Sequence, residues 1–595
     1  MALREQIAKL AKPFNVKYIV NPSQAEIRKL ALENIKTCLV SSYGNINRIT
    51  LRKARMEKYT YIIAERGEES KYSSKIITPD DAEKYIKLQK EFIEKAGTLI
   101  EIQGYYGIGH TAVPIQAFYT LNAANVAGMQ QVMMFSREYV EGPEWYKNEF
   151  KPVFKIVYTP DLVLEDLPGK MAIIVDLENY VTYVMNSDYF GESKKGILRM
   201  LNHYFYLKGG LVLHAGAKSV RIDGVDYAVA ILGLSGTGKT TTTFARHGEH
   251  SMPIQDDMIT LWPDGNYTVT ENGCFAKTFG LTEKTEPVIY KGTIDPSAWV
   301  ENVYMNPDGS YDFSKEALTP EEVARYREIF ILTGNDPAHV DAYINGEVRF
   351  EDVVDEYGIP KDGWDFVVWT QNGRSIIPLS AIDNVADLNN LPPLKFIGIL
   401  NRDEGPDAAT PGIVKFATPE QASGYFMLGE TSKTSAAGKE RGKTRSPFTQ
   451  PFFPLNHKLQ AERFQELMEK NKNLITWMMN TGYVGGDQLD EKRGKALKVR
   501  ISHSTYMLEA LFRDQIKWTQ DPDFGYLVVD INAPENKPLL EKVPAEILCP
   551  RILYEKQGRI REYEEWVVRI KKEREEFLRK YGVAENIIKA VLNVK

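Results

Sequence analysis

Residues 233–240 read Gly-Leu-Ser-Gly-Thr-Gly-Lys-Thr and fit the pattern G-x-x-x-x-G-K-[ST], which suits the binding of an oligophosphate. An apolar, β-branched run at 227–233 predicts a buried strand before the loop, and the threonine-rich stretch after Lys239 predicts a helix. In this setting backbone N–H groups surround the phosphates, Lys239 reaches the β- and γ-phosphates, and Thr240 offers its hydroxyl to a divalent metal. The alternative, a glycine-rich turn without a ligand, is disfavoured by the complete motif in its strand–loop–helix setting.

Two further segments carry side chains that suit a metal ion beside such a loop. Asp256 and Asp257 follow an apolar stretch, and a carboxylate at a strand end next to a phosphate loop commonly holds the metal. His214 ends an apolar run just before the phosphate-loop strand, where a neutral imidazole is a credible ligand. Structural alternatives stay open: the aspartates as a turn, and the histidine as a core residue.

Four cationic side chains are candidates to balance phosphate or carboxylate charge. Lys194 and Lys195 stand between glycines and precede an apolar helical pattern, so burial near a site competes with an ordinary surface pair. A lysine crowded by another cation and a metal has a lowered pKa and can bind metal as the neutral amine. The other two are Lys277 and Arg374, and arginine is the better bidentate clamp for a carboxylate. On the sequence alone, each of these two is equally compatible with a surface role.

The elements around these residues predict an α/β protein with two lobes. Residues 1–208 alternate charged helical patterns with short strands, expected at 59–63, 98–102 and 171–175. We expect 110–135 to form a helix flanked by strands. This mixture predicts an N-terminal α/β lobe on the substrate side.

The second predicted lobe, 209–595, contains the phosphate loop at 233–241 and a strand at 258–262. The acidic stretch at about 308–368, with helical segments around 320–329 and 350–357, predicts an inserted surface subdomain. Residues 429–448, rich in Gly, Ser, Thr, Lys and Arg, predict a mobile loop.

The C-terminal tail, about 555–595, is expected to be helical, with a charged amphipathic helix over 555–580. Its apolar side would carry Trp566, Val567, Ile570 and Phe577. We favour packing on the domain surface over a partner-binding role for this helix.

The bulk composition narrows the class of protein. The chain has 595 residues, 43% hydrophobic and 26% charged, which is typical of soluble globular proteins. A net charge of −6 argues against a nucleic-acid binder, and no apolar run approaches the ~20 residues that span a bilayer. Three distant cysteines, Cys38, Cys274 and Cys549, form no disulfide framework and fit a reducing compartment. We therefore expect a cytoplasmic protein without nucleic-acid or membrane partners, as a monomer or small homo-oligomer.

Taken together, the motifs resemble those of the ATP-type phosphoenolpyruvate carboxykinase family. The resemblance runs from about residue 45 to 485 and is strongest at 187–290. The similar segments, in chain order, are Tyr189-Phe-Gly-Glu-Ser-Lys-Lys-Gly, Leu234-Ser-Gly-Thr-Gly-Lys-Thr-Thr, Asp256-Asp257, Glu271-Asn-Gly-Cys-Phe-Ala-Lys-Thr, Glu286-Pro-Val-Ile-Tyr, Asn372-Gly-Arg374 and Asn480-Thr-Gly-Tyr. The resemblance implies a two-lobed carboxykinase-like fold whose C-terminal lobe binds the nucleotide.

The resemblance also implies residue roles. Lys195, His214 and Asp257 would hold a catalytic Mn²⁺, and Thr240 a nucleotide-bound Mg²⁺. The catalytic residues would be Lys194, Lys195, Lys239, Asp256, Lys277 and Arg374, with the cations neutralising the phosphoryl group in transit. The ATP site would comprise Gly233, Leu234, Ser235, Gly236, Thr237, Gly238, Lys239, Thr240, Thr241, Glu286 and Arg441. The oxaloacetate side would comprise Arg55, Tyr189, Lys195 and Arg374.

The implied reaction converts oxaloacetate and ATP to phosphoenolpyruvate, ADP and CO₂. Loss of CO₂ leaves an enolate, which attacks the γ-phosphoryl group, so the site must supply positive charge and exclude water. A closing loop is therefore expected, and 429–448 is a candidate for part of it. The chain departs from the family where H-C-S-A-N becomes His214-Ala-Gly-Ala-Lys218, in the weakly kept motif around Arg55, in the longer acidic stretch and at the C-terminus.

Two other functions remain open on the sequence. One is a phosphate-loop kinase that phosphorylates another carboxylate or a protein. The retained Tyr189, Lys195 and Arg374 favour the carboxykinase, because a different acceptor needs no carboxylate clamp beside a lysine metal ligand. The other is a non-catalytic nucleotide-binding regulator, for which loss of the metal ligands is expected, yet Lys195, His214 and Asp257 are all present.

Overall fold

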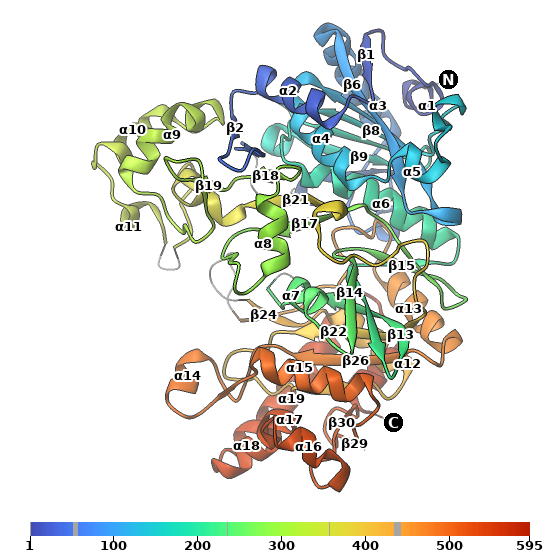
Figure 1. Cartoon of the computed structure of the whole chain (residues 1–595), viewed down its shortest axis with the longest axis vertical. Coiled ribbons are helices and arrows are strands. Elements are labelled where there is room, and N and C mark those ends of the chain that lie inside the picture. The colour runs from blue at the N-terminus through green and yellow to red at the C-terminus, as the bar shows by residue number, and fades with distance from the viewer. Residues whose placement is uncertain (1, 52–56, 235, 356–357, 434–441, 595) are drawn as a thin grey trace. The chain divides into compact units, whose positions relative to one another are not determined.

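A computed structural model describes residues 2–51, 57–234, 236–355, 358–433 and 442–594 of the chain (Figure 1). Three of the expected site residues, Arg55, Ser235 and Arg441, lie outside the described residues. The protein is a mixed α/β protein with several sheets. No helix in the described residues is both long and apolar enough to span a membrane.

The chain divides into two compact units, each built from two stretches of sequence. Unit 1 comprises Met1–Tyr204 and Thr270–Asp383, and unit 2 comprises Phe205–Val269 and Asn384–Lys595. The first change of unit, at residue 204, lies close to the expected lobe boundary at 208. The expected lobe 209–595 differs from this division, because 270–383 groups with the N-terminal residues.

Unit 1 contains an eight-stranded mixed sheet in the order β1-β6-β7-β8-β10-β9-β4-β5. Its strands are β1 (Lys17–Val20), β4 (Thr60–Ile63), β5 (Lys75–Ile77), β6 (Thr98–Tyr106), β7 (Val113–Thr120), β8 (Phe154–Thr159), β9 (Ala172–Asp176) and β10 (Val181–Met185). Helix α3 (Pro79–Ala96) contributes its apolar side to the core below this sheet, with Tyr85, Ile86 and Ile93 buried. The Thr78 hydroxyl accepts the Asp81 N–H at its start, and Gly97, at φ 73°, ends it.

The expected strands at 59–63 and 171–175 are confirmed within one residue and that at 98–102 is the first part of the longer β6, but the expected helix at 110–135 is only partly correct. Its first part is strand β7, and only α4 (Ala124–Met133) is helical. β7 lies between β6 and β8, so nearly all of its side chains are buried and it lacks the alternating polarity that distinguishes a strand from a buried helix.

A second sheet explains why 270–383 belongs to unit 1. Its order is β17-β21-β18-β3-β2, which joins three strands of that segment to two strands near the N-terminus. The strands are β2 (Cys38–Val40), β3 (Ile46–Arg48), β17 (Gly273–Lys277), β18 (Trp299–Glu301) and β21 (Arg374–Pro378). The acidic stretch has its own aromatic core, in which Tyr326, Phe330 and Trp369 are buried. Its helices α9 (Pro320–Leu332) and α11 (Phe350–Val353) correspond to the two expected helical segments, the second being shorter than expected.

Unit 2 is built on an eight-stranded sheet in the order β14-β12-β13-β22-β26-β23-β30-β29. Its strands are β12 (Ala215–Ile222), β13 (Val225–Gly233), β14 (His250–Gln255), β22 (Leu394–Asn401), β23 (Ile413–Lys415), β26 (Ile475–Asn480), β29 (Trp518–Gln520) and β30 (Leu527–Val529). The three central strands β13, β22 and β26 are parallel, and β12 runs antiparallel to β13. The expected strand at 258–262 is β15 (Ile259–Leu261) of a smaller sheet.

The C-terminal residues of unit 2 form a series of helices (Figure 1). The expected tail helix is α19 (Ile560–Lys580), which packs on helices α18 (Pro550–Lys556) and α20 (Glu585–Leu592) of its own unit. Val567 and Ile570 are buried as expected, whereas Trp566 and Phe577 are half-buried. The same face also buries Arg574, which the apolar pattern does not predict.

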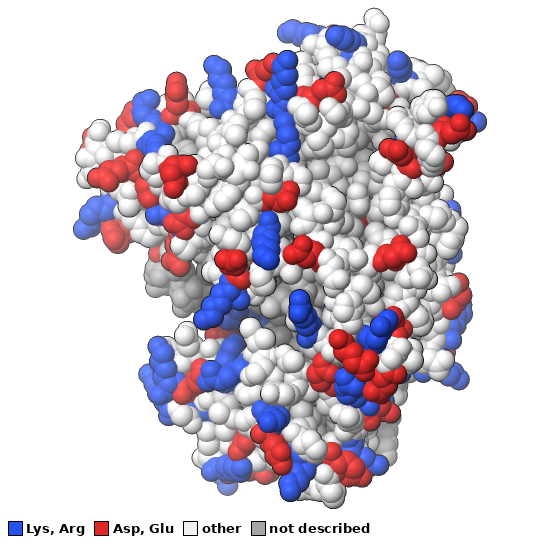
Figure 2. Space-filling model, in the orientation of Figure 1, with Lys and Arg blue, Asp and Glu red and all other residues white. Residues whose placement is uncertain are grey.

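Charged side chains of both signs are interspersed on the face of the molecule drawn in Figure 2. On that face lysine and arginine do not gather into one large field.

Candidate active site

The phosphate-loop motif lies in the predicted setting, between strand β13 and helix α7 (Lys239–Phe244). Gly236 and Gly238 have φ values of 87° and 88°, a left-handed conformation that glycine adopts without strain. Gly233 is required for a different reason, because a Cβ there would lie 2.4 Å from the Thr237 Oγ1. The sequence motif therefore matches the backbone that forms the loop.

Three segments of unit 2 bring polar side chains to the same edge of the sheet as the loop. His214 directly precedes β12, whose Ala215 pairs with Leu232 of the phosphate-loop strand. Asp257 follows β14, the other neighbour of β12. β12 starts, and β14 ends, at the edge of the sheet where β13 ends. The side chains of His214, Lys239 and Asp257 therefore converge at this edge.

The contacts within this group are short and directed. Asp257 Oδ1 accepts a hydrogen bond from Lys239 Nζ at 2.6 Å and lies 2.9 Å from His214 Nε2. His214 Nδ1 lies 3.1 Å from the Phe448 carbonyl oxygen, to which a neutral ring can only donate. Burial, reinforced by the Lys239 cation, lowers the pKa of His214, and Asp257 opposes this shift. The two groups that flank the ring, a carbonyl oxygen at Nδ1 and a carboxylate at Nε2, are both acceptors, so both contacts are hydrogen bonds only when the ring carries two protons, a charge that burial beside Lys239 opposes.

Among the described residues, no group of three or more His, Cys, Asp and Glu side chains is arranged to hold a metal ion. His214 and Asp257 are a pair, so the expected metal site depends on a ligand of another type, such as Lys195. Lys195 belongs to unit 1, where it forms an ion pair with Glu192 within helix α6 (Gly191–Leu207). For Lys195 to bind a metal through its amine, this contact with Glu192 has to break and the amine has to lose its proton.

Unit 1 gathers most of the expected substrate-side residues around Phe275. Lys194 Nζ lies 5.5 Å from the Phe275 ring centroid, and the Arg374 guanidinium 6.0 Å from it. Tyr189 is buried, and its ring centroid lies 6.4 Å from that of Phe275. Lys277 and Arg374 are direct partners on the adjacent strands β17 and β21. The structure therefore places Tyr189, Lys194 and Arg374 around Phe275, with Lys277 next to Arg374 on the adjacent strand; their roles stay predictions.

Two buried acids beside these residues carry no role in the sequence prediction. Glu271 is fully buried and accepts hydrogen bonds from Lys194 Nζ at 2.9 Å and Tyr106 Oη at 3.2 Å. Glu301, the strand partner of Arg374, accepts the Phe190 N–H at 3.1 Å, and burial raises its pKa to about 8. A buried carboxyl with a raised pKa beside cations makes these residues candidates for the functional site. Charge alternation in the sequence does not reveal either residue, because each pairing joins distant segments.

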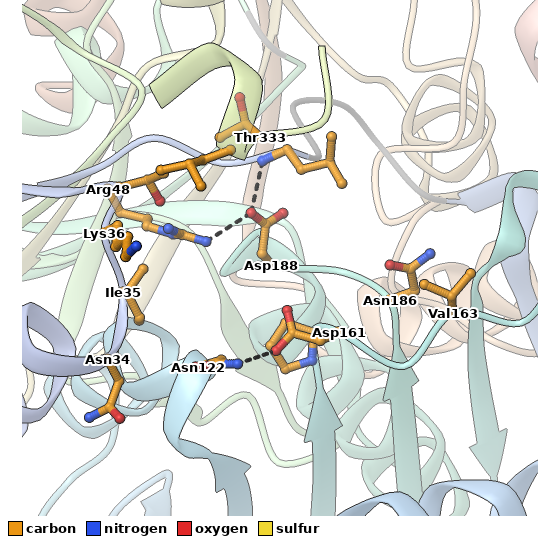
Figure 3. A pocket seen from close by; sticks show the side chains of 14 residues that line it. Asn34, Ile35, Lys36, Arg48, Asn122, Asp161, Val163, Asn186, Asp188 and Thr333 are labelled. Atoms are coloured by element: carbon orange, nitrogen blue, oxygen red, sulfur yellow. Dashed lines mark hydrogen bonds and ion pairs between the residues drawn. The ribbon is translucent and has the colours of Figure 1, made fainter. Parts of the chain in front are cut away.

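Unit 1 also contains a pocket of about 450 Å³ that is lined in part by Asp188, the residue before Tyr189 (Figure 3). Arg48 and Asp188 line it and form an ion pair of 3.1 Å, and Asp188 also accepts the Leu51 N–H at 2.8 Å. On another wall Asn122 donates to Asp161. None of the described catalytic candidates lines this pocket.

In unit 2, two more segments contact the phosphate loop or its neighbouring strand. Thr481 follows β26, and its Oγ1 donates to the Thr237 carbonyl oxygen of the loop at 2.8 Å. Thr481 belongs to the Asn480-Thr-Gly-Tyr segment, which is part of the family resemblance and to which the sequence alone assigns no role. Thr481 therefore links the end of β26 to the loop.

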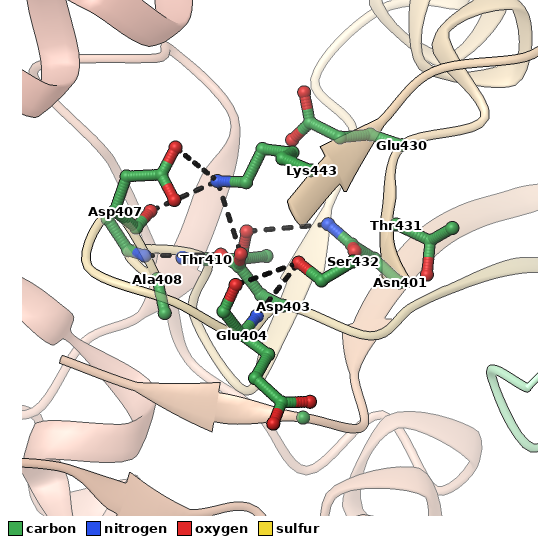
Figure 4. Close-up of polar contacts among 12 residues, drawn as sticks. Asn401, Asp403, Glu404, Asp407, Ala408, Thr410, Glu430, Thr431, Ser432 and Lys443 are labelled. Carbon is green, nitrogen blue, oxygen red and sulfur yellow. Dashed lines mark hydrogen bonds and ion pairs between the residues drawn. The ribbon is translucent and has the colours of Figure 1, made fainter. Parts of the chain in front are cut away.

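The hairpin β24 (Thr431–Lys433) and β25 (Gly442–Thr444) flanks residues 434–441, where Arg441 lies outside the described residues (Figure 4). Buried Lys443 lies 3.1 Å from Asp403 Oδ1, just after β22. Asp403 Oδ2 also accepts the N–H groups of Ala409 and Thr410. These contacts attach the hairpin to the carboxyl end of the strand next to β13. The expected mobile loop 429–448 is thus partly a paired hairpin.

The remaining expected residues are distributed between the units. Glu286 precedes helix α8 (Pro287–Ile294) in unit 1, although it was expected among the nucleotide contacts. Asp256 is buried in unit 2 beside Asp257. The described loop residues Leu234, Thr240 and Thr241 lie with Lys239 in unit 2.

The fold and the site together define a mixed α/β protein that carries a phosphate-loop motif at the carboxyl end of the parallel central strands of a mixed sheet. Residues 16–345 and 350–535 match the model of the phosphoenolpyruvate carboxykinase family. The chain belongs to this family. The match covers most of the acidic stretch expected to be an insertion, interrupted only at 346–349, and ends before helix α19.

Curated relatives are named phosphoenolpyruvate carboxykinase (ATP). The protein of Staphylococcus haemolyticus is 26% identical over 535 residues, covering 86% of this chain and 84% of the relative. The protein of Bradyrhizobium diazoefficiens is 27% identical over 412 residues, covering 66% and 63%. The protein of Staphylococcus aureus strain Newman is 27% identical over 495 residues, covering 79% and 76%.

Proposed function

We propose that this chain converts oxaloacetate and ATP to phosphoenolpyruvate, ADP and CO₂. The observation that carries the proposal is the convergence of His214, Lys239 and Asp257 at the end of the phosphate-loop strand, in a member of this family. In this proposal the two units are the two lobes of a carboxykinase-like fold. Unit 2 takes the nucleotide, and unit 1 takes the carboxylate substrate.

The phosphate loop is proposed to hold the triphosphate of ATP. Backbone N–H groups of 233–241 would surround the phosphates, with Gly236 and Gly238 giving the loop its turn. The Lys239 amine, which is hydrogen-bonded to Asp257 in this structure, would move toward the β- and γ-phosphates when ATP binds. The Thr240 hydroxyl would take part in holding the Mg²⁺ of the nucleotide. Ser235, Glu286 and Arg441 remain predicted nucleotide contacts.

The residues present fit a Mn²⁺ ion on one observation in particular. The Phe448 carbonyl lies 3.1 Å from His214 Nδ1, the kind of outer hydrogen-bond acceptor that orients imidazole ligands, and His214 Nε2 lies beside the Asp257 carboxylate, so the two ligand groups adjoin. His214 and Asp257 would hold the ion together with Lys195. When bound, the ion supplies positive charge where negative charge develops on oxygen. Asp256 is proposed to assist as its buried neighbour.

On unit 1, Arg374 and Tyr189 are proposed to orient the carboxylates of oxaloacetate, with Arg55 as a predicted third contact. The bond from the β-carbon to the departing carboxylate breaks, CO₂ leaves, and its electron pair forms the enolate. The enolate oxygen attacks the γ-phosphorus as the bond to ADP breaks. Lys194 and Lys277 neutralise the charge in transit, and no protein nucleophile is needed.

The carboxylate role of Arg374 can be tested against an arginine of the same unit. Arg327 forms an exposed ion pair with Asp341 in the acidic stretch, so Arg327→Met is a matched control for Arg374→Met. Loss of a charge-assisted clamp costs about 1.5–3 kcal/mol, so Arg374→Met should lower kcat/KM for oxaloacetate up to about a hundredfold. The KM for ATP should stay within threefold in both variants. Equal kcat/KM for the two variants would contradict the assignment of unit 1 as the carboxylate side.

A further inference from the structure

Lys218 occupies an unusual position for a lysine. It is the last residue of His214-Ala-Gly-Ala-Lys218, the segment in which the chain departs from the resembled family motif. Its side chain lies in the middle of strand β12 and is completely buried. Burying an ammonium group costs free energy unless each of its three N–H donors has a hydrogen-bond acceptor. The acceptors of Lys218 therefore show which part of the structure it stabilises.

All three donors of Lys218 have an acceptor. The Nζ atom donates to the carbonyl oxygens of Thr242 at 2.6 Å and Ala245 at 3.0 Å, and lies 2.7 Å from His247 Nδ1. Burial lowers the pKa of His247 to about 3, so its ring is a neutral acceptor. Glu509 of helix α15 (Ile501–Phe512) is the charged neighbour that favours the charged form of Lys218 and so raises its pKa. Glu509 also accepts the Gly248 N–H.

The two carbonyls belong to the end of helix α7, the helix that begins at Lys239 directly after the phosphate loop. The last carbonyls of a helix have no partner within it, and a cation at this end also complements the helix dipole. The same face of β12 contacts α7 a second time at Gly216, where a Cβ would lie 2.2 Å from Thr243 Oγ1. A short helix is thus held at its far end by β12.

We propose that Lys218 is a positioning residue for the nucleotide: by binding the end of α7 it sets the placement of Lys239 and Thr240 relative to the phosphates. Because α7 has only six residues, a shift at its last turn is transmitted to its first. The inference rests on the proposed function, since it assumes that this loop binds ATP. It predicts a defect in ATP binding that leaves oxaloacetate binding unchanged.

The chain contains a closely matched control in unit 1. Lys155 is also buried, and its Nζ donates to the carbonyls of Ile7 at 2.9 Å and Leu10 at 2.6 Å, the end of helix α1 (Leu3–Lys9). Lys218→Met and Lys155→Met therefore each remove a buried lysine that binds two carbonyls at a helix end. Only the first helix follows the phosphate loop.

The test measures the Kd for ATP by calorimetry and the KM values for ATP and oxaloacetate, on folded protein at pH 6. This pH lies below the value of about 7 to which burial lowers the pKa of Lys218, so the amine is charged. We expect Lys218→Met to weaken ATP binding at least tenfold, with the KM for oxaloacetate within twofold. Lys155→Met should leave ATP binding within twofold. Unchanged ATP affinity in Lys218→Met, or an equal loss in Lys155→Met, would overturn the proposal.

If Lys218→Met does not fold, Lys218→Gln takes its place, because its shorter, uncharged amide remains polar but loses one of the three donors and the positive charge at the helix end. We expect it to weaken ATP binding three- to tenfold, and unchanged affinity would overturn the proposal. Measurements on the unaltered chain distinguish a failure of the proposed reaction from a failure of the proposed role of Lys218. ATP binding without phosphoenolpyruvate formation would contradict the proposed reaction alone, whereas no ATP binding would overturn both.

Discussion

The contact between the C-terminal helix α19 and the hairpin β24–β25 predicts a large and specific loss of stability when one arginine is removed. Arg574 is buried, and its guanidinium donates to both carboxylate oxygens of Glu430, at 2.8 and 3.2 Å. It also donates to Tyr425 Oη at 2.9 Å. Burial alone would raise the pKa of the Glu430 carboxyl, but Arg574, Arg445 and Lys443 together lower that pKa strongly, so the carboxylate stays charged.

The magnitude for Arg574→Met follows from what the variant leaves behind. Removing one partner of a buried ion pair costs about 3–5 kcal/mol, since the other charge stays buried without compensation. Here Arg445 Nε still donates to Glu430 at 2.8 Å, so we expect the lower end, about 3 kcal/mol. That corresponds to an unfolding equilibrium constant larger by a factor of about 100.

The assay is urea unfolding followed by circular dichroism, with Arg579→Met as the control on the same helix. Arg579 pairs with Glu585 at the exposed surface, so its loss should leave the midpoint unchanged within scatter. Glu430→Gln combined with Arg574→Met should recover part of the loss, because residue 430 then carries no buried charge and Arg445 keeps its ion pair with Glu573. If Arg574→Met and Arg579→Met have the same midpoint, the contact between tail and hairpin does not stabilise unit 2 as argued.

Three further predictions concern the site and its acid sensitivity. Asp257→Asn should abolish the activation of phosphoenolpyruvate formation by Mn²⁺ while leaving the circular dichroism spectrum unchanged; retained activation would contradict the metal role. Thr481→Val removes the hydrogen bond to the loop carbonyl of Thr237 and should raise the KM for ATP about threefold to tenfold in steady-state assays, with no change contradicting it. Burial lowers the pKa of His247 to about 3 and of His457 to about 4, so below pH 6.5 the unfolded chain binds protons that the folded chain does not. The contribution of each of these histidines is therefore full above pH 6.5 and falls by about 2 kcal/mol at pH 5, and a His457→Gln variant whose urea midpoint changes between pH 7 and pH 5 as much as that of the unaltered chain would contradict this.

The local part of the site could be predicted from the sequence. The phosphate-loop motif specifies its own strand, turn and helix, and the structure confirms β13 and α7 on either side of it. His214 and Asp257 were expected at neighbouring strand ends, and they lie 2.9 Å apart. These predictions succeeded because each depends on a short segment and on the rule that strand ends meet at a sheet edge.

The pairings between distant segments could not be predicted. The partner of Lys194 is Glu271, 77 positions away, and that of Arg574 is Glu430, 144 positions away. Arg574 stands where the helical period calls for an apolar side chain, and only the tertiary partner makes its burial possible. The grouping of 270–383 with unit 1 has the same origin, because β18 pairs with β3 across more than 250 residues.

The most direct test of the central claim is phosphoenolpyruvate formation by the purified chain from oxaloacetate with Mn²⁺ and Mg²⁺, supplied in parallel with ATP, GTP or pyrophosphate. The Lys195→Ala variant serves as the control, since Lys195 is the proposed ligand that unit 1 contributes. We predict metal-dependent product with ATP that the variant abolishes. Product with GTP or pyrophosphate instead would keep the reaction and contradict the donor. No product with any donor, in a chain that still binds ATP, would contradict the carboxykinase reaction itself.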